Sequence, residues 1–282
     1  TYINCPAQFY FKYIANLYEL QNLDEEINNL LFGNILHRTI ELLYEPYINQ
    51  LITAAIIDQL LNNNRLISKK LNQAFTDNHF EHHKEGKNLL LKRVIKRLVV
   101  KVLENDKTDA PFKIVGLETR EYTTTLPLTN GQEVVISGSI DRVDEVFLPD
   151  GSTAYRIIDY KTGNVKLQTP TALKKDLPDY LNAYFIQPDY KTGFQTYLYS
   201  YLFWVHHHKN IALKAGLYAL KQLSGGIRYL RQGEILSAEL LAEFEKQLCL
   251  LLNQIFDPNT PFTQTPLPER YTYSPYQGLV GF

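Results

Sequence analysis

The sequence predicts an α/β protein in which a mainly helical first part precedes a β-sheet. Apolar residues recur at helical spacing through much of the region 30–104. Segments rich in Val, Ile and Tyr, separated by turn signals, follow over 113–161. Helical spacing returns over 195–204 and 237–256, with a strand expected at 215–220 between them. The expected order is helix, then three strands, then further helices around one more strand.

A β-hairpin is predicted over residues 138–163. Its centre, Pro-Asp-Gly-Ser at 149–152, has the composition of a tight turn, and both flanks have the composition of strands. Because the two strands run back to back, Asp141 and Asp159 should meet at their outer ends. Lys161 lies two positions after Asp159, so it should point to the same face.

Two carboxylates that meet in this way repel each other unless a cation lies between them. Hard oxygen ligands suit Mg²⁺ or Mn²⁺. A lysine beside such a metal can orient or deprotonate a water molecule, or offset charge that develops on a phosphate. Asp141, Asp159 and Lys161 therefore predict metal-assisted hydrolysis of a phosphodiester. The simpler alternative, an ion pair on an exposed hairpin, leaves the second aspartate unexplained.

An amphipathic helix is expected from residue 30 to 44, with Gly33 or Asn34 capping its start. His37 and Glu41 lie one turn apart on one face of this helix. On its own, a histidine in such a helix is more often a packed or surface residue than a metal ligand.

Residues 52–104 look wholly helical, with separate helices expected over 51–61, 68–83 and 87–103. The last of these carries basic residues at helical spacing. A basic stripe of this kind could contact phosphates, although a solvated helix face is the commoner explanation. The stripe consists of Lys92, Arg93, Lys96, Arg97 and Lys101.

The hairpin motifs resemble the PD-(D/E)XK nuclease superfamily, and within it the exonuclease domains of the RecB and AddB type. The matching segments are Gly-Ser-Ile-Asp-Arg-Val-Asp at 138–144 and Ile-Asp-Tyr-Lys-Thr-Gly at 158–163. The resemblance implies a restriction-endonuclease-like αβββαβ core, with a central mixed β-sheet flanked by helices and a helical insertion. It also implies that Asp141 and Asp159 hold Mg²⁺ or Mn²⁺ with the backbone carbonyl of Tyr160, while Lys161 orients or activates water.

Two further motifs extend the resemblance beyond the hairpin. Gly33-x-x-x-His37 matches the family's first motif, in which the imidazole is a metal ligand. Gln195-x-x-x-Tyr199 matches a motif thought to bind the DNA backbone and to brace the active site. The alternative for the second motif is aromatic helix packing, but a polar residue in so apolar a helix needs a partner.

Three acidic residues lie outside these motifs or repeat one of them. Glu118 matches a glutamate that family members often have in the first strand, so it is a candidate to support the metal ligands, as is Glu41. A plain surface carboxylate explains Glu118 equally well. A second Asp-Tyr-Lys-Thr-Gly begins at Asp189. Since Pro188 breaks any strand ladder before it, we expect a loop and the start of a helix there, with no metal.

No iron–sulfur cluster is expected. In many family members the cysteine at the position of Cys5 is the first of four cluster ligands, and the other three lie near the C-terminus. Here Tyr271, Ser274 and approximately Val280 stand in place of those cysteines, and one thiolate cannot hold the cluster. Cys5 is better explained as a small buried residue. A short helix that packs on the core is expected within residues 2–20. The C-terminal tail should still pack near this helix.

Composition is that of a globular protein, because 45% of the residues are hydrophobic and 21% are charged. No apolar run is long enough to span a membrane, and no signal peptide is visible. Cys5 and Cys249 are the only cysteines, so disulfides are not expected and a cytoplasmic location fits. The net charge of −1 neither supports nor excludes nucleic acid as a partner. The sequence lacks methionine, which suggests a fragment or missing methionines.

We expect a single nuclease domain over residues 1–282. Its parts would be a helical N-terminal part (1–110), a catalytic sheet core (111–222) and a C-terminal helix and tail (223–282). The resemblance implies a metal-dependent deoxyribonuclease, in particular an exonuclease. It would be the nuclease part of a helicase–nuclease that processes DNA ends in recombinational repair, with DNA and a helicase domain or subunit as partners.

The alternative function is a nuclease-like module that has lost catalysis and binds DNA or a partner protein. A module of that kind would be expected to lose one of Asp141, Asp159 or Lys161, and all three are present. The sequence also contains no ATP-binding Gly-x-x-x-x-Gly-Lys-Ser/Thr motif, so any motor would lie elsewhere.

Overall fold

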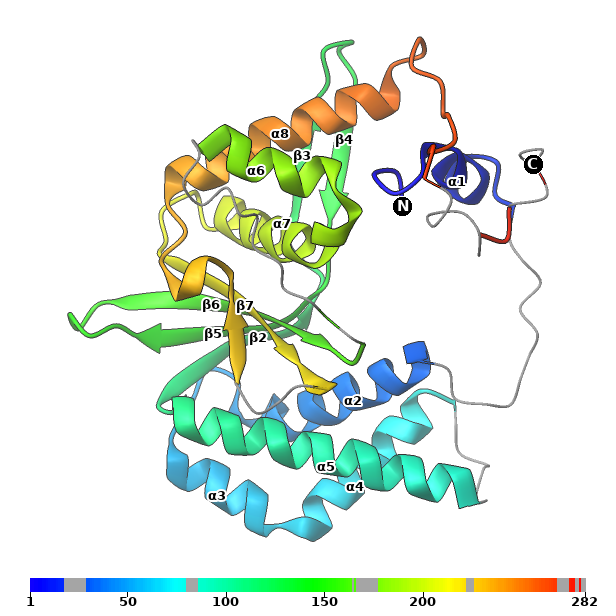
Figure 1. Cartoon of the computed structure of the whole chain (residues 1–282). Coiled ribbons are helices and arrows are strands. Elements are labelled where there is room, and N and C mark those ends of the chain that lie inside the picture. Colours follow the sequence, from blue (N-terminus) through cyan, green and yellow to red (C-terminus); the bar gives the residue numbers. More distant parts are fainter. Residues whose placement is uncertain are drawn as a thin grey trace.

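A mixed sheet of six strands lies between two layers of helices in the computed structural model (Figure 1). The strand order is β1-β2-β5-β6-β7-β8, and every neighbouring pair is antiparallel except β6 and β7, which run parallel. The predicted α/β class with a central mixed sheet is therefore confirmed. The strands are β1 (Leu51–Ile52), β2 (Phe112–Thr119), β5 (Ile140–Phe147), β6 (Thr153–Lys161), β7 (Leu213–Ala219) and β8 (Ile227–Tyr229).

The structure describes most of the chain, namely residues 1–17, 29–79, 86–163, 165, 177–221, 226–267, 274–276 and 279. Within these ranges, no helix combines the length and the apolar character that crossing a bilayer requires.

Four helices lie on one face of the sheet (Figure 1), and all four contribute buried residues to one apolar cluster with its strands. Ile35 and Ile40 of the first helix, for example, are buried in one cluster with Ile114 and Ile158 of the strands. These helices are α2 (Asn29–Tyr44), α3 (Ala54–Asn62), α4 (Asn64–Asp77) and α5 (Gly86–Asp109).

Three helices cover the opposite face. Tyr197 and Phe244 from two of them share a second apolar cluster with Ile157 of β6. The last helix begins directly after Ser237, whose hydroxyl oxygen accepts the backbone N–H of Leu240 at 3.1 Å, as an N-cap should. The helices are α6 (Leu177–Ile186), α7 (Lys191–His206) and α8 (Ala238–Phe256), which confirms the helices expected over 195–204 and 237–256.

The predicted hairpin is confirmed as β5 and β6. Arg142 pairs with Ile158 and Phe147 with Thr153, so the strands run back to back from the turn. In the turn, the Asp150 carboxylate accepts the backbone N–H of Ser152 at 2.9 Å, and Gly151 has φ of +83°, a value that favours glycine.

Two expectations about the strands need correction. Leu51 and Ile52 form the edge strand β1 rather than the start of a helix, because their backbones pair with Lys113 and Phe112. The region 113–161 also holds more than the three strands expected, because β3 (Thr123–Pro127) and β4 (Glu133–Ser137) form a separate two-stranded hairpin. The three strands that follow one another across the core are therefore β2, β5 and β6.

Helix boundaries also differ from those expected. Gly33 and Asn34 lie inside α2, which already includes Asn29, so neither residue caps it. The helix expected over 68–83 begins at Asn64, where the side chain of Asn63 accepts the N–H of Leu66, and it ends at Asp77. The helix expected over 87–103 continues to Asp109.

The N-terminal segment packs on the C-terminal one. It forms α1 (Pro6–Phe9) and a π-helical turn (Tyr10–Ile14). The expectation that this segment packs on the main core is wrong, because neither main apolar cluster of the described residues includes it. Phe11 stacks on Tyr276, and the Tyr276 hydroxyl donates to the backbone carbonyl of Leu17 at 2.6 Å. The expected contact between tail and N-terminal helix is confirmed.

The second Asp-Tyr-Lys-Thr-Gly forms a short 3₁₀ helix (Pro188–Tyr190) and the first turn of α7, as expected. Its Gly193 packs against Tyr184 so closely that a Cβ atom would overlap the ring, whereas a Cβ atom on Gly163 of the first copy would meet nothing within 4 Å. The two copies of one sequence thus lie in different environments.

We predict that Gly193→Ala lowers the free energy of unfolding by about 1–2 kcal/mol in urea denaturation. Overpacking costs about 1–3 kcal/mol, and the better helix propensity of Ala offsets up to about 1 kcal/mol of this. Gly163→Ala is the control and should change stability by less than about 0.5 kcal/mol. Equal effects of the two substitutions would contradict the packing described for Gly193.

Candidate active site

The candidate site lies at the end of the sheet where the two helical layers meet. Strand β2 brings Glu118, the start of β5 brings Asp141, and the end of β6 brings Asp159 and Lys161. Helix α2 adds His37 from one layer, and α7 adds polar side chains from the other. The sequence-predicted pair Asp141 and Asp159 does come together, because the β5–β6 register places them at matching ends of the hairpin.

His37, Glu118 and Asp141 form a compact cluster of potential metal ligands, since one donor atom from each lies within 4.8 Å of the others. The Nδ1 atom of His37 is 3.4 Å from Glu118 Oε1 and 3.6 Å from Asp141 Oδ2. The other ring nitrogen, Nε2, lies 3.0 Å from the backbone carbonyl oxygen of Tyr160. Tyr160 also donates its backbone N–H to Asp141 Oδ2 at 2.7 Å.

Glu118 reaches the cluster through an unusual backbone conformation. Its φ is +46°, in the left-handed region that non-glycine residues rarely adopt. Strain of this kind costs on the order of 1–3 kcal/mol and is concentrated at functional sites. The structure thus places Glu118 against His37, which makes it a potential ligand rather than only a supporting carboxylate.

The Asp159 carboxylate has an incompletely satisfied oxygen. It is 2% exposed, and Lys161 Nζ lies 2.8 Å from both of its oxygens. Only Oδ1 accepts a well-aligned hydrogen bond, so the buried Oδ2 is left without one among the described residues. Beside the Lys161 charge, this oxygen has room for one more directed contact, of the kind that a metal cation would supply.

These donors fit a hard divalent cation. Mg²⁺ and Mn²⁺ prefer oxygen ligands such as the carboxylates of Glu118, Asp141 and Asp159 and the carbonyl of Tyr160, and His37 adds one imidazole.

Without a cation, bound protons compensate the negative charge of the carboxylates. Burial and the neighbouring Asp159 raise the pKa of Asp141 to about 7, and burial also raises the pKa of Asp159. Although burial opposes it, the hydrogen bond that His37 donates to Glu118 and the charge of Asp141 raise the pKa of His37 to about 9.

Lys161, Gln195 and Tyr199 form a chain of hydrogen bonds beside the cluster. Lys161 Nζ donates to Gln195 Oε1 at 2.8 Å, and Gln195 Nε2 donates to the Tyr199 hydroxyl at 2.6 Å. The Tyr199 ring lies against Gly138, where a Cβ atom would come within 2.8 Å of it. The partner expected for Gln195 is therefore Lys161, and a side chain larger than hydrogen at position 138 would displace Tyr199.

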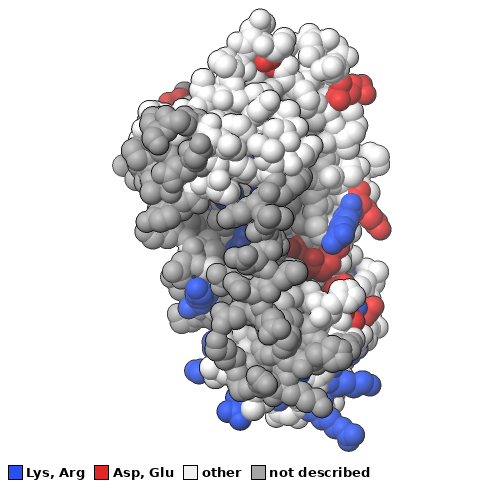
Figure 2. All heavy atoms as spheres, turned by 90° about the vertical axis from the view of Figure 1, so that its right-hand side faces the viewer, with Lys and Arg blue, Asp and Glu red and all other residues white. Residues whose placement is uncertain are grey.

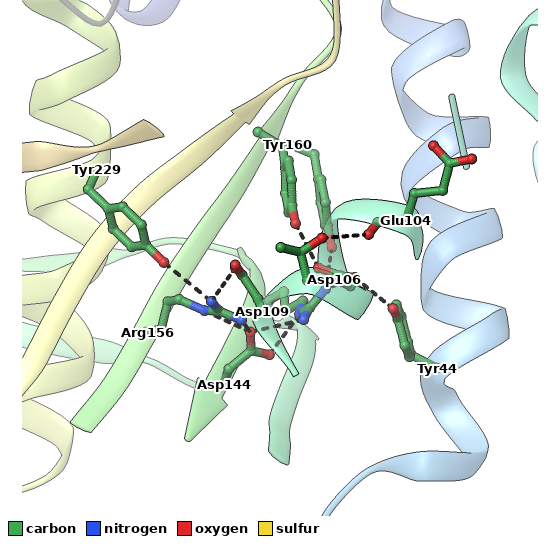
Figure 3. Close-up of polar contacts among 11 residues, drawn as sticks. Tyr44, Glu104, Asp106, Asp109, Asp144, Arg156, Tyr160 and Tyr229 are labelled. Carbon is green, nitrogen blue, oxygen red and sulfur yellow. Dashed lines mark hydrogen bonds and ion pairs between the residues drawn. The ribbon is translucent and has the colours of Figure 1, made fainter. Parts of the chain in front are cut away.

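Behind the site lies a buried ionic network that sequence reasoning missed (Figure 3). Arg142 is fully buried and donates to both Asp144 oxygens, at 2.7 and 3.0 Å, and to Asp106 at 2.7 Å. It also donates to the Tyr160 hydroxyl at 3.1 Å. Arg156 donates to Asp144 at 2.7 Å, which ties β5 to β6 through their side chains.

The network continues into the helical layer beyond the sheet. The hydroxyls of Tyr44 and Tyr218 donate to Asp106 at 2.6 and 2.7 Å, and Arg156 donates to Asp109 at 2.7 Å (Figure 3). The signal for it was present in the Asp-Arg-x-Asp motif. Because side chains alternate along a strand, Arg142 and Asp144 must face away from Asp141.

The remaining candidates lie outside the cluster. Glu41 forms an ion pair with Arg38 at 2.9 Å and lines the cavity beside the cluster without reaching it. This cavity has a volume of about 660 Å³ and is lined by Asn34, His37, Arg38, Glu41, Asp77, Asn78, Glu118 and Arg120.

Cys5 is buried and not bonded to another cysteine, and Ser274 accepts a hydrogen bond from Gln8 at 3.2 Å. Tyr271 and Val280 lie outside the described residues.

Comparisons with known proteins agree with this geometry. The family model of the PD-(D/E)XK nuclease superfamily matches residues 1–270, in line with the expected restriction-endonuclease-like fold. Similar chains include proteins named as the B subunits of ATP-dependent helicase/deoxyribonucleases. The one from Clostridium acetobutylicum is 33% identical over 184 residues, that from Clostridium perfringens 28% over 179, and that from Alkaliphilus metalliredigens 26% over 175. These matches cover 58% of this chain, but only 15% of the length of each relative.

We predict that the affinity for Mn²⁺ rises with pH between about pH 6 and pH 9. The sign follows from the pKa values: with its pKa near 7, Asp141 holds a proton below that pH, and with its pKa near 9, His37 holds one up to pH 9. A metal must displace both protons, so binding weakens as pH falls. Calorimetric titration in buffers of different ionisation enthalpy would measure affinity and proton release together. An affinity that is independent of pH, with no proton released, would contradict this prediction.

We predict that Arg142→Met lowers the free energy of unfolding by about 3–5 kcal/mol. The substitution leaves the buried carboxylates of Asp144 and Asp106 without their main partner. Lys246→Met is the matched control, because Lys246 is an exposed cation that pairs with Glu243 at 3.4 Å, and such pairs contribute less than about 1 kcal/mol. Urea denaturation of both variants tests the difference. A loss below about 1 kcal/mol for Arg142→Met would show that the network is not structural.

Proposed function

Because the chain belongs to the PD-(D/E)XK nuclease superfamily, we propose that it is a divalent-metal-dependent deoxyribonuclease. The observation that supports this most directly is the meeting of Asp141, Asp159 and Lys161 with His37 at one end of the sheet. A nuclease-like module that had lost catalysis would have no need to keep buried carboxylates against a lysine and a histidine.

His37, Asp141 and Asp159 would hold the metal with the carbonyl of Tyr160, and Glu118 is close enough to His37 to join them. When bound, Mg²⁺ or Mn²⁺ supplies positive charge for the phosphate oxygens and lowers the pKa of a coordinated water. The strained backbone at Glu118 and the raised pKa values are the conditions that such an ion would relieve.

Lys161 is placed to hold the attacking water or a phosphate oxygen. Its ammonium has three donors, and Asp159 and Gln195 occupy two directions, so one N–H stays available. The ion pair with Asp159 holds this lysine directed into the site. Hydrolysis then joins the water oxygen to phosphorus while one P–O ester bond breaks, and a water proton ends on the leaving oxygen.

Tyr199 is placed to bind the DNA backbone. Its hydroxyl oxygen accepts from Gln195, so its own proton is free to donate to a phosphate oxygen. Because Gln195 links Tyr199 to Lys161, contact with the backbone and orientation of the lysine are coupled.

We further propose that the activity belongs to a larger helicase–nuclease that acts on DNA ends, as an exonuclease. The support is the likeness to the helicase/deoxyribonuclease relatives, of which this chain spans 15%. A helicase domain or subunit would be the partner. A protein with this function would act where the DNA is, which agrees with the cytoplasmic location expected from the cysteine content.

The test is cleavage of end-labelled linear DNA in Mg²⁺, Mn²⁺ or EDTA by the wild type, Asp159→Ala and Lys161→Ala. We expect metal-dependent cleavage that falls by at least about 10²-fold in both variants, since each removes a group that acts on the reacting atoms. The second copy of the motif supplies matched controls: Asp189→Ala and Lys191→Ala remove the same residue types from the start of α7. They should keep activity within about twofold.

DNA binding without cleavage would contradict the proposed catalysis. If folded wild-type protein binds DNA but does not cleave it with either metal, with or without a helicase partner, the chain is a binding module. The lengths of the labelled products, where cleavage occurs, identify the polarity.

A further inference from the structure

The exposed side of α4 and α5 carries positive charge over a long continuous stretch. Residues 65–76 of α4 and 89–103 of α5 contain no Asp or Glu. The whole chain has 29 basic and 30 acidic residues, so the excess of positive charge on this surface is local. We call it the α4–α5 basic face, and it consists of Arg65, Lys69, Lys92, Arg93, Lys96, Arg97 and Lys101.

The cations of this face are mostly not neutralised. Across the seam between the helices, Lys92 Nζ donates to Asn72 Oδ1 and Lys96 Nζ to Ser68 Oγ, both at 3.0 Å. These partners are neutral, so they orient the ammonium groups but leave their charge available. Lys101 is the exception, because it pairs with Glu104 at 3.0 Å.

The exposed Lys69, Arg93 and Arg97 form no ion pair with the described residues. Several lysines elsewhere on the molecule differ, because each has a carboxylate partner. These pairs are Lys113 with Glu145, Lys209 with Glu245 and Lys246 with Glu243. The basic face is thus a surface whose charges are available to an anionic partner.

The face leads directly to the candidate site. Helix α4 ends at Asp77, which pairs with Arg38 at 2.6 Å and lines the same cavity as His37 and Glu118. At a rise of about 1.5 Å per residue, Asn72 lies about 7 Å and Arg65 about 18 Å back from Asp77 along the helix. Lys92 lies level with Asn72, as their hydrogen bond requires.

Figure 2 views the end of the molecule at which β6 finishes. Acidic atoms gather near the middle of this view, while Lys and Arg gather in its lower part, the height at which Figure 1 places α4 and α5. Carboxylates and, below them, basic side chains at the height of α4 and α5 therefore appear on one side of the molecule.

We propose that the α4–α5 basic face binds the sugar–phosphate backbone of the DNA whose scissile phosphate lies in the candidate site. This inference rests on the proposed function and adds where the substrate runs. Phosphates follow one another at about 3.4 Å per strand along a duplex, so the distances of about 7–18 Å correspond to about two to five phosphates from the cavity rim. A contact of this kind is independent of base sequence and sensitive to salt.

The test compares two triple variants of equal charge change. Lys69→Ala/Arg93→Ala/Arg97→Ala removes exposed cations of the basic face, and Lys113→Ala/Lys209→Ala/Lys246→Ala removes carboxylate-paired lysines elsewhere. Both are made in the Asp159→Ala background, and binding of a labelled 30-mer, duplex or single-stranded, is followed by anisotropy between about 50 and 200 mM salt. Thermal unfolding checks that both variants fold.

We expect the basic-face variant to bind at least about tenfold more weakly at 100 mM salt, with a salt slope lower by about 2–3, since each lost phosphate contact removes about 0.7–0.9. The control variant should stay within about twofold. In an otherwise wild-type background, hydrolysis of the small phosphodiester bis(p-nitrophenyl) phosphate should be unchanged, because it does not reach the face.

Equal DNA binding and equal salt slopes of the two variants would overturn the inference. Loss of binding to polyglutamate by the basic-face variant, with DNA binding intact, would also overturn it and assign the face to an acidic protein. Failure of the proposed function is recognised separately, because the wild type would then hydrolyse neither DNA nor the small phosphodiester.

Discussion

The backbone of Tyr160 holds the candidate site together. Its N–H donates to Asp141, and its carbonyl oxygen accepts from His37, so one residue of β6 fixes a side chain of β5 and one of α2. Its side chain lies on the face of the sheet that α2–α5 cover. There the ring stacks on Tyr218 and the hydroxyl accepts from the buried Arg142. The ionic network therefore sets the position of the residue around which the ligands gather, and damage to the network should reach the site.

The site concentrates features that oppose folding. Burial raises the pKa of both Asp141 and Asp159, the charge of Asp159 raises that of Asp141 further, and Glu118 has a strained backbone. A protein retains such costs where a bound ion or substrate relieves them. The stabilising interactions lie immediately behind, in the fully buried pairs of Arg142 with Asp144 and Asp106. The strained groups thus lie at the end of the sheet, and the satisfied ionic network lies behind them under α2 and α5.

The parts of the site that the sequence predicts depend on local contacts, whereas the parts that it does not predict depend on residues far apart in the chain. The meeting of Asp141, Asp159 and Lys161 followed from strand periodicity and one turn, both of which are local. The contributions of His37 and Gln195 came from a family resemblance, because no local rule brings α2 and α7 to one end of a sheet. The position of Glu118 depends on a left-handed backbone that its residue type disfavours, and Asp106 joins the network from a helix 36 positions before Arg142. The edge strand β1 was missed because two residues are too few to show a period.

The central claim is that these side chains hold one divalent metal, and anomalous diffraction from crystals grown with Mn²⁺ would test it most directly. The account predicts a peak within about 2.5 Å of carboxylate oxygens of Asp141 and Asp159, with His37 or the Tyr160 carbonyl completing the contacts. Mn²⁺ bound instead at Glu41 and Asp77, or no peak at the end of β6 at saturating Mn²⁺, would contradict the account.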